Sequence, residues 1–226
     1  MDLSISQSLE SPSPWKFWQF LDSAFPTGGF AHSGGLEAAR QHGEISGRAG
    51  LEGWILASLR QLAHASLPWV CTAHREPHRI HELDDLSDAF LTNHVANRAS
   101  RLQGSALVLA ADRALGARLP AGTAPLPCQH LAPLFGALAR HLEFPLADTA
   151  QGFVFIQLRG WIAAAVRLNI VGPLAGQAVQ SSVARHASEA TALGLSLSLD
   201  DLAQTAPLLD LWQGTQDRLY SRLFQT

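Results

Sequence analysis

The sequence predicts an all-α protein, a single globular domain of roughly eight to ten helices without a sheet. Apolar residues recur at helical spacing along most of the 226 residues, and no segment shows sustained alternation of apolar and polar residues. β-Branched residues are scarce, and hydrophobic residues make up 47% of the chain, enough for a sizeable core. We therefore expect helices packed around one hydrophobic core.

Glycine and proline divide this chain into helical segments. Pro68 starts a helix that Pro77 stops, Gly43 and Gly47 end the helix over 34–42, and Gly172 and Pro173 break the longest apolar segment. The clearest loop is 116–130, which holds three prolines and two glycines. The spacing of apolar residues predicts helices over 15–21, 34–42, 51–65, 68–74, 81–94, 97–115, 131–142, 146–170, 174–193 and 207–224, the last of which could also be a tail.

The N-terminal residues 1–14 are rich in serine and proline, so we expect a mobile segment there and a helical domain over 15–226. They lack the basic and apolar regions of a signal peptide. The most apolar run, 153–171, contains Arg159 and Arg167, which favours a buried core helix over a membrane span. We expect a cytoplasmic protein without a membrane segment, and its net charge of −3 argues against nucleic-acid binding.

One stretch, residues 22–39 (DSAFPTGGFAHSGGLEAA), concentrates residues with special backbone properties between two helices. Proline fixes φ and glycine permits positive φ or close approach, and this stretch holds Pro26, Gly28, Gly29, Gly34 and Gly35. We therefore expect a loop of fixed shape. Asp22 and Ser23 fit a turn with local hydrogen bonds, Ser33 fits an N-cap, and Glu37 falls in the first turn of the next helix.

The same stretch contains the residue types of a nucleophilic triad, Asp22, His32 and Ser33. A nucleophile elbow needs G-x-S-x-G after a strand, whereas Ala31 lies here and no strand is predicted. We interpret Ser33 as a helix cap and His32 as the partner of a backbone group or of another protein. A small hydrolase using His32 and Ser33 is an alternative function. A nucleotide site is not expected, because the loop lacks the Gly-Lys-Ser/Thr ending.

A second alternative is a nickel-binding carrier. On an unbroken helix, Cys71, His74, His78 and His81 would share one face, which is the arrangement of metal ligands. Pro77 disrupts that helix, and isolated histidine clusters are usually solvated or capping. We therefore predict no metal site at 71–81.

Residues 93–104 carry two chemically different polar faces when they are drawn as a helix. The basic face comprises His94, Arg98, Arg101 and Ser105, and the small polar face comprises Asn93, Asn97, Ser100 and Gly104. A surface helix needs only one polar side, so we expect one face to be buried against this chain or a partner. Arg98 and Arg101 then contact a partner or pair internally with Asp22, Glu37 or Asp112.

The C-terminal tail, residues 216–226, mixes arginine with large apolar residues, which is the composition of an interface hot spot. Helical spacing places Leu219, Tyr220, Leu223 and Phe224 on one side, away from Arg218 and Arg222. An uncovered terminus of this kind frays. We therefore expect a partner protein to order the tail, with Arg222 making a charge-assisted hydrogen bond there or anchoring the glycine-rich loop.

These segments resemble the UreF family of urease accessory proteins. The glycine-rich stretch carries the family's Asp-Ser, proline, glycine, Phe-x-His-Ser and Gly-Leu-Glu in order. Further matches are NHVANRASRLQG at 93–104 and LYSRLFQT at 219–226, with weaker ones at 130–136 and 163–174. The resemblance runs from about Trp15 to the last residue, and Gln216 stands where the family usually has histidine.

The resemblance implies an all-α, non-enzymatic protein of urease maturation. Such a protein bridges the accessory protein UreD (also called UreH) and the GTPase UreG, engages apo-urease and forms a homodimer. Nickel insertion is coupled to GTP hydrolysis on the GTPase, so no cofactor, catalytic residue or metal ligand is expected on this chain. The residues expected to bind partners or to form the motifs are Asp22, Ser23, Pro26, Gly28, His32, Ser33, Gly35, Glu37, Asn93, His94, Arg98, Arg101, Gly104, Leu219, Tyr220, Arg222, Leu223 and Phe224.

Overall fold

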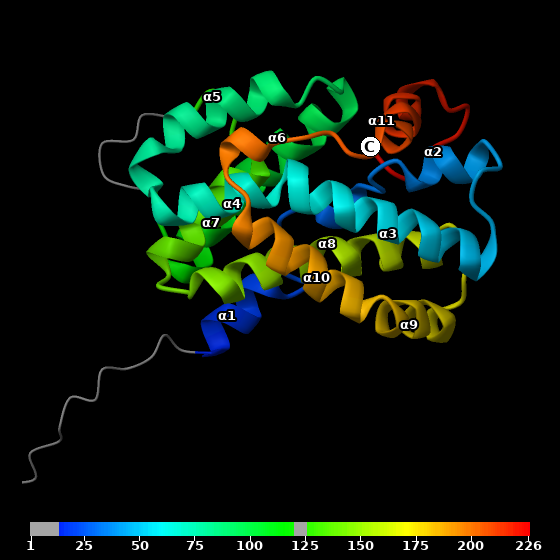
Figure 1. Ribbon diagram of the computed structural model, residues 1–226, viewed down its shortest axis with the longest axis horizontal. Helices are drawn as coiled ribbons and strands as arrows, with labels where there is room; N and C mark the ends of the chain where they lie inside the picture. Colours follow the sequence, from blue (N-terminus) through cyan, green and yellow to red (C-terminus); the bar gives the residue numbers. More distant parts are fainter. Residues whose placement is uncertain (1–13, 120–125) are drawn as a thin grey trace, which may run out of the picture.

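The computed structural model describes residues 14–119 and 126–226, and this part of the chain is helical without any strand (Figure 1). The predicted all-α fold class is confirmed. The N-terminal segment expected to be mobile, up to residue 13, lies outside the described residues, as does the centre of the predicted loop at 116–130. The α-helices are α1 (Pro14–Leu21), α2 (Leu36–Gln41), α3 (Gly47–Ala65), α4 (Leu67–Arg75), α5 (Ile80–Phe90), α6 (His94–Leu115), α7 (Leu131–His141), α8 (Leu146–Arg167), α9 (Pro173–Ser182), α10 (Ala184–Ser196) and α11 (Pro207–Gly214). Short 3₁₀ turns lie at Gly29–Ala31, Pro77–Arg79, Leu199–Asp201 and Gln216–Arg218.

The hydrophobic core is centred where α4 packs against α7, since both helices are buried along most of their length. Gly136 permits this approach, because a Cβ atom there would overlap the carbonyl group of Val70. Phe135 of α7 lies between Phe20 and Phe153, with ring centroids 4.8 and 5.1 Å apart. α8 joins this core and contacts α3, α4, α9 and α10, so the long helices share one interior.

Several helix boundaries differ from the sequence prediction, among them the end of the last helix, which stops at Gly214 instead of residue 224. Two further differences are breaks inside or between expected helices. The helix expected over 81–94 ends at Phe90, and Asn93 starts α6 by accepting hydrogen bonds from Val95 N at 3.0 Å and Ala96 N at 3.3 Å. The helix expected over 174–193 divides at Val183 into α9 and α10, although neither glycine nor proline lies there. Both breaks allow the chain to change direction on the core.

The apolar run in α8 forms a core helix, as predicted. Both of its arginines bond within the chain: Arg159 donates to the Leu21 carbonyl and Arg167 to the Phe30 carbonyl. Within residues 14–119 and 126–226, no helix has both the length and the apolar character needed to cross a membrane. The two arginines instead connect α8 to the segments before and inside the glycine-rich loop.

Candidate functional site

Three of the predicted motifs meet at one end of the molecule, where the C-terminus lies beside α2 and α11 (Figure 1). The glycine-rich loop, the start of α6 and the tail form a surface that we call the motif junction, which comprises residues 30–37, 93–98 and 216–226. Asp22, Ser23 and Pro26 lie at the exposed start of the loop, outside the junction. Gly28 and Gly35 adopt the positive φ angles expected of them, 74° and 90°.

Glu37 of α2 is the buried centre of the junction, with 2% of its surface exposed. Its Oε1 atom accepts a hydrogen bond from Leu223 N at 2.7 Å. Its Oε2 atom accepts from Phe224 N at 3.1 Å and from Gln216 Nε2 at 2.7 Å. A buried carboxylate needs such donors to offset its lost hydration. Glu37 therefore fixes the tail to α2.

The tail is ordered by its own chain, which corrects the expectation that a partner orders it. Phe224 is 4% exposed, and its ring centroid lies 4.2 Å from the Arg167 guanidinium carbon. Gln225 N donates to the Ala31 carbonyl at 2.8 Å, and Ser33 N donates to the Thr226 carbonyl at 2.6 Å. The surface that orders the tail is therefore the glycine-rich loop of the same chain.

The four large apolar residues of the tail, which were predicted to share one side, point in different directions. After the turn at 216–218 the tail is not helical, so the helical spacing used in the prediction does not apply. Phe224 points inward, Leu219 is half-buried, and Tyr220 and Leu223 are exposed to 104% and 53%. The tail thus presents an aromatic and an aliphatic side chain to solvent from a fixed backbone.

Asp217 links the tail to the basic face of α6. It accepts a bidentate pair from Arg98 at 2.8 and 3.0 Å, a hydrogen bond from Arg222 at 3.1 Å, and lies 3.4 Å from His94 Nε2. The Arg98 hydrogen bonds, aided by the nearby charges, lower the pKa of the Asp217 carboxyl. Arg98 therefore pairs with an acid that the sequence analysis did not consider, and Arg222 binds within the tail instead of anchoring the loop.

The small polar face of α6 packs against the rest of the chain, with Gly104 buried and Asn93, Asn97 and Ser100 half-buried. Ser100 Oγ lies 3.1 Å from His130 Nδ1 and accepts from Leu131 N at 3.1 Å. Gly104 is buried against the backbone of Gln129. Asn93 Nδ2 donates to the Asp210 carbonyl of α11 at 2.7 Å. The prediction that one polar face is internal is confirmed, whereas Arg101 lies outside the junction, 3.9 Å from Asp88.

The triad required by the hydrolase alternative is not assembled. Ser33 is fully buried, and its Oγ atom accepts from Glu37 N at 3.3 Å, close to the capping role predicted for it, although Gly35 is the N-cap. His32 Nδ1 is hydrogen-bonded to Thr226 Oγ1. Asp22 accepts from Ala24 N at 2.7 Å, the predicted local bond. Each of the three polar groups is thus bonded elsewhere, and none of these bonds joins two of them.

A cavity of about 800 Å³ lies beneath the glycine-rich loop, between α3, α6 and α8. Two buried polar atoms of its lining residues, Trp54 Nε1 and Ser87 Oγ, have no hydrogen-bond partner among the described residues. Such atoms are usually satisfied by ordered water. The cavity has the size and the polar groups to hold several water molecules.

The metal-ligand candidates at 71–81 do not converge. Cys71 is buried with its sulfur 4.0 Å from the Gly194 carbonyl, and His74 Nε2 lies 2.8 Å from the Phe144 carbonyl. Pro77 begins a separate turn, which leaves His78 and His81 exposed. Cys71, His74, His78 and His81 therefore do not share one helix face in the structure.

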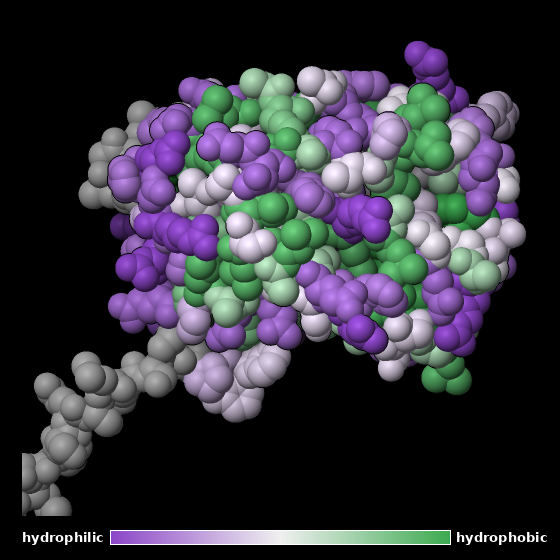
Figure 2. All heavy atoms as spheres, in the orientation of Figure 1, coloured by the Kyte–Doolittle hydropathy of each residue, from purple (hydrophilic) through white to green (hydrophobic). Residues whose placement is uncertain are grey.

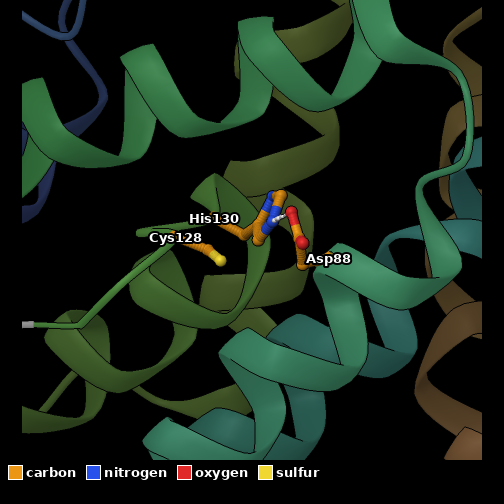
Figure 3. A group of neighbouring side chains, drawn as sticks. All are labelled: Asp88, Cys128 and His130. Carbon is orange, nitrogen blue, oxygen red and sulfur yellow. Dashed lines mark hydrogen bonds and ion pairs between the residues drawn. The ribbon is translucent and has the colours of Figure 1, made fainter.

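A different group of metal-ligand side chains lies where α5 meets the segment before α7. In the described residues, Asp88, Cys128 and His130 place three ligand atoms within 4.8 Å of one another, and their side chains point together (Figure 3). Asp88 Oδ1 lies 3.1 Å from His130 Nε2. This group could not be predicted from the sequence, because its members are far apart in the chain and only the Cys-x-His spacing at 128–130 is local.

Asp84, one turn before Asp88, holds the backbone of this group. It is fully buried, and its carboxylate accepts from Cys128 N at 3.0 Å, Gln129 N at 2.9 Å and His130 N at 2.7 Å. Gln129 has a φ of 62°, a conformation that few residues other than glycine adopt. Burial lowers the pKa of His130, which keeps its ring neutral near pH 7.

The half-buried position of His32 makes the stability of the chain depend on pH. Burial, followed by the charge of Arg98, lowers the pKa of His32 from 6.5 to about 4. Between these values the unfolded chain binds a proton that the folded chain does not, so stability should fall as the pH decreases from 6.5 to about 4. Urea unfolding of the wild type and of His32→Asn across this range measures the effect. Equal pH dependence of the two proteins would contradict it.

These features define an all-helical protein whose described motifs meet at one surface, against which the C-terminal tail is docked. The UreF family model matches residues 45–184, and the chain belongs to the UreF family. Proteins named urease accessory protein F from Oryza sativa subsp. indica and Arabidopsis thaliana are 36% and 37% identical to it. The alignments cover 97% and 93% of this chain and 87% and 91% of the relatives. Urease accessory protein UreF of Rhodopseudomonas palustris is 29% identical over 94% of this chain and 92% of its own length.

Proposed function

We propose that this chain acts in urease maturation by bridging a UreD/UreH-type accessory protein and the GTPase UreG. The complex then engages apo-urease, and GTP hydrolysis on the GTPase is coupled to insertion of nickel into the urease active site. Membership of the UreF family, whose relatives are named urease accessory proteins, supports the maturation role. In this proposal the chain works in the cytoplasm as a homodimer and is not itself an enzyme.

The exposed side of the motif junction is the observation that best supports the bridging role. Tyr220, Leu223 and Phe30 are exposed to 104%, 53% and 76% on a backbone that internal hydrogen bonds hold in place. Arg98 and Arg222 border a shallow groove of about 550 Å³ beside them. Aromatic and arginine side chains on a rigid base are typical of interface hot spots, because little ordering entropy is lost on binding. We assign this surface to the UreD/UreH-type partner.

Further apolar surface lies next to the junction. Figure 2 shows a hydrophobic patch over α11, bordered by hydrophilic residues, and the exposed leucines of this helix are Leu208 and Leu211. The patch extends the candidate interface beyond the tail. It also provides a second group of side chains that a partner could cover.

Replacing Tyr220 with alanine should weaken binding of the UreD/UreH-type partner about tenfold to a hundredfold without changing the melting temperature. The side chain contacts solvent in the free chain, so its loss removes interface area only. Titration calorimetry with the purified partner measures the affinity. Leu223→Ala should act in the same direction, and Leu174→Ala on α9, an equally conservative change at an exposed site, should have no effect. Unchanged affinity in both tail variants would refute the assignment of this surface.

A further inference from the structure

We propose that Asp88, Cys128 and His130 form a binding site for a borderline divalent cation, of which zinc and nickel are the representative cases. The site is independent of the bridging role, because none of its three ligand residues belongs to the motif junction. It also departs from the sequence-based expectation that this chain carries no metal ligand.

The types and spacing of the three ligand atoms fit such a cation. A thiolate, an imidazole and a carboxylate together favour zinc, nickel or copper over magnesium and calcium, which prefer oxygen ligands. The 3.1 Å between Asp88 Oδ1 and His130 Nε2 matches two ligands that share one metal at bonds of about 2.0–2.1 Å. The Cys128 sulfur lies within 4.8 Å of both atoms, so a small rotation of this half-buried side chain completes the set.

The surrounding residues hold the ligands in place before any metal arrives. Ser100 Oγ lies 3.1 Å from His130 Nδ1, which leaves Nε2 of the ring as the ligand atom. Asn97 Nδ2 donates to Asp88 Oδ1 at 2.8 Å and orients the carboxylate. The three hydrogen bonds to Asp84 fix the backbone of both Cys128 and His130. Such outer hydrogen bonds are the usual support of metal ligands in proteins.

The position of the site allows exchange with solvent. His130 is 1% exposed, whereas the side chain of Asp88 is 40% exposed, so a cation can enter from the Asp88 side. Binding forms bonds from the metal to Nε2, Oδ1 and Sγ, and the thiol proton leaves to solvent. The negative charges of Cys128 and Asp88 then balance the divalent cation. Three protein ligands leave a fourth position open for water or for a donor from a partner.

The proposal is tested by metal titration of the purified full-length chain after treatment with a chelator. We expect one equivalent of Zn²⁺ or Ni²⁺ to bind, with a thiolate-to-metal charge-transfer band in the near ultraviolet for Ni²⁺. Cys128→Ser should abolish that band, and Cys128→Ser and Asp88→Asn should each weaken binding at least about tenfold. Competition between the two metals identifies the preferred one.

Matched variants separate this site from adventitious binding. Cys71→Ser removes the other cysteine and His78→Ala removes an exposed histidine, and both should retain the wild-type affinity and stoichiometry. Thermal unfolding without metal confirms that each variant is folded, and the charge-transfer band reports Cys128 directly. The proposal is overturned if the wild type binds no equivalent, or if Cys128→Ser and Asp88→Asn bind metal as tightly as the wild type does. Since no partner protein is required, failure here leaves the bridging role untouched.

Discussion

Glu37→Ala is expected to destabilise the chain by about 3 kcal/mol and to release the C-terminal tail. The substitution removes the only acceptor that the structure gives to Leu223 N and Phe224 N, and both donors come from a segment docked on the core. It also leaves Gln216, which is fully buried, with a 3.4 Å contact to the Phe224 carbonyl in place of its 2.7 Å bond to Glu37. Buried donors without acceptors carry the full cost of lost hydration.

Urea unfolding and hydrogen exchange together measure this effect. In a chain of this length, a loss of that size corresponds to a melting temperature lower by roughly 6–12 °C. Glu37→Gln keeps the shape but turns an amide donor toward the tail, so it should also destabilise. Glu189→Ala, at an exposed glutamate of α10, should change stability by less than about 0.5 kcal/mol. Protected amides of Leu223 and Phe224 in Glu37→Ala would show that another group holds the tail.

The fold could be predicted from the sequence to the extent that it depends on local spacing. Apolar residues at helical intervals and breaking residues such as Pro77 located most of the helices within a few positions. The break at Val183 was missed, because it has no local signal and α9 and α10 contact different neighbours across the core. The helical pattern of 81–94 also concealed the capping role of Asn93. Its side chain starts α6, and α5 ends before it, at Phe90.

The candidate sites were predictable only in part for a related reason. Each motif of the junction stood out by composition, but the bonds that join them connect distant residues, such as Arg98 and Asp217. Local spacing placed a possible metal group at 71–81, where burial directs Cys71 and His74 to backbone carbonyls. The group at Asp88 and His130 is assembled by helix packing, which a single sequence does not reveal.

Gly104→Ala is expected to destabilise the chain by about 3 kcal/mol, despite the higher helix propensity of alanine. A Cβ atom at this position of α6 would overlap the Gln129 carbonyl oxygen and would lie 2.9 Å from the carbonyl carbons of Gln129 and His130. All three obstacles are backbone atoms. They cannot retreat by a change of rotamer, because the carboxylate of Asp84 binds three successive N–H groups of the same segment.

The structure can respond only by moving α6 away from this segment or by breaking the Asp84 hydrogen bonds. Either response separates Ser100 from His130, so Gly104→Ala should also weaken metal binding at the proposed site. Gly160→Ala in α8 is the matched control. Apart from its own stretch of helix, no atom of the described residues lies within 4 Å of its Cβ position, so it should stabilise the chain by up to about 1 kcal/mol. Urea unfolding of both variants decides the matter. If Gly104→Ala is as stable as Gly160→Ala, α6 does not pack closely against residues 128–130. The contact between Ser100 and His130, which we infer to orient the metal ligand, would then also be absent.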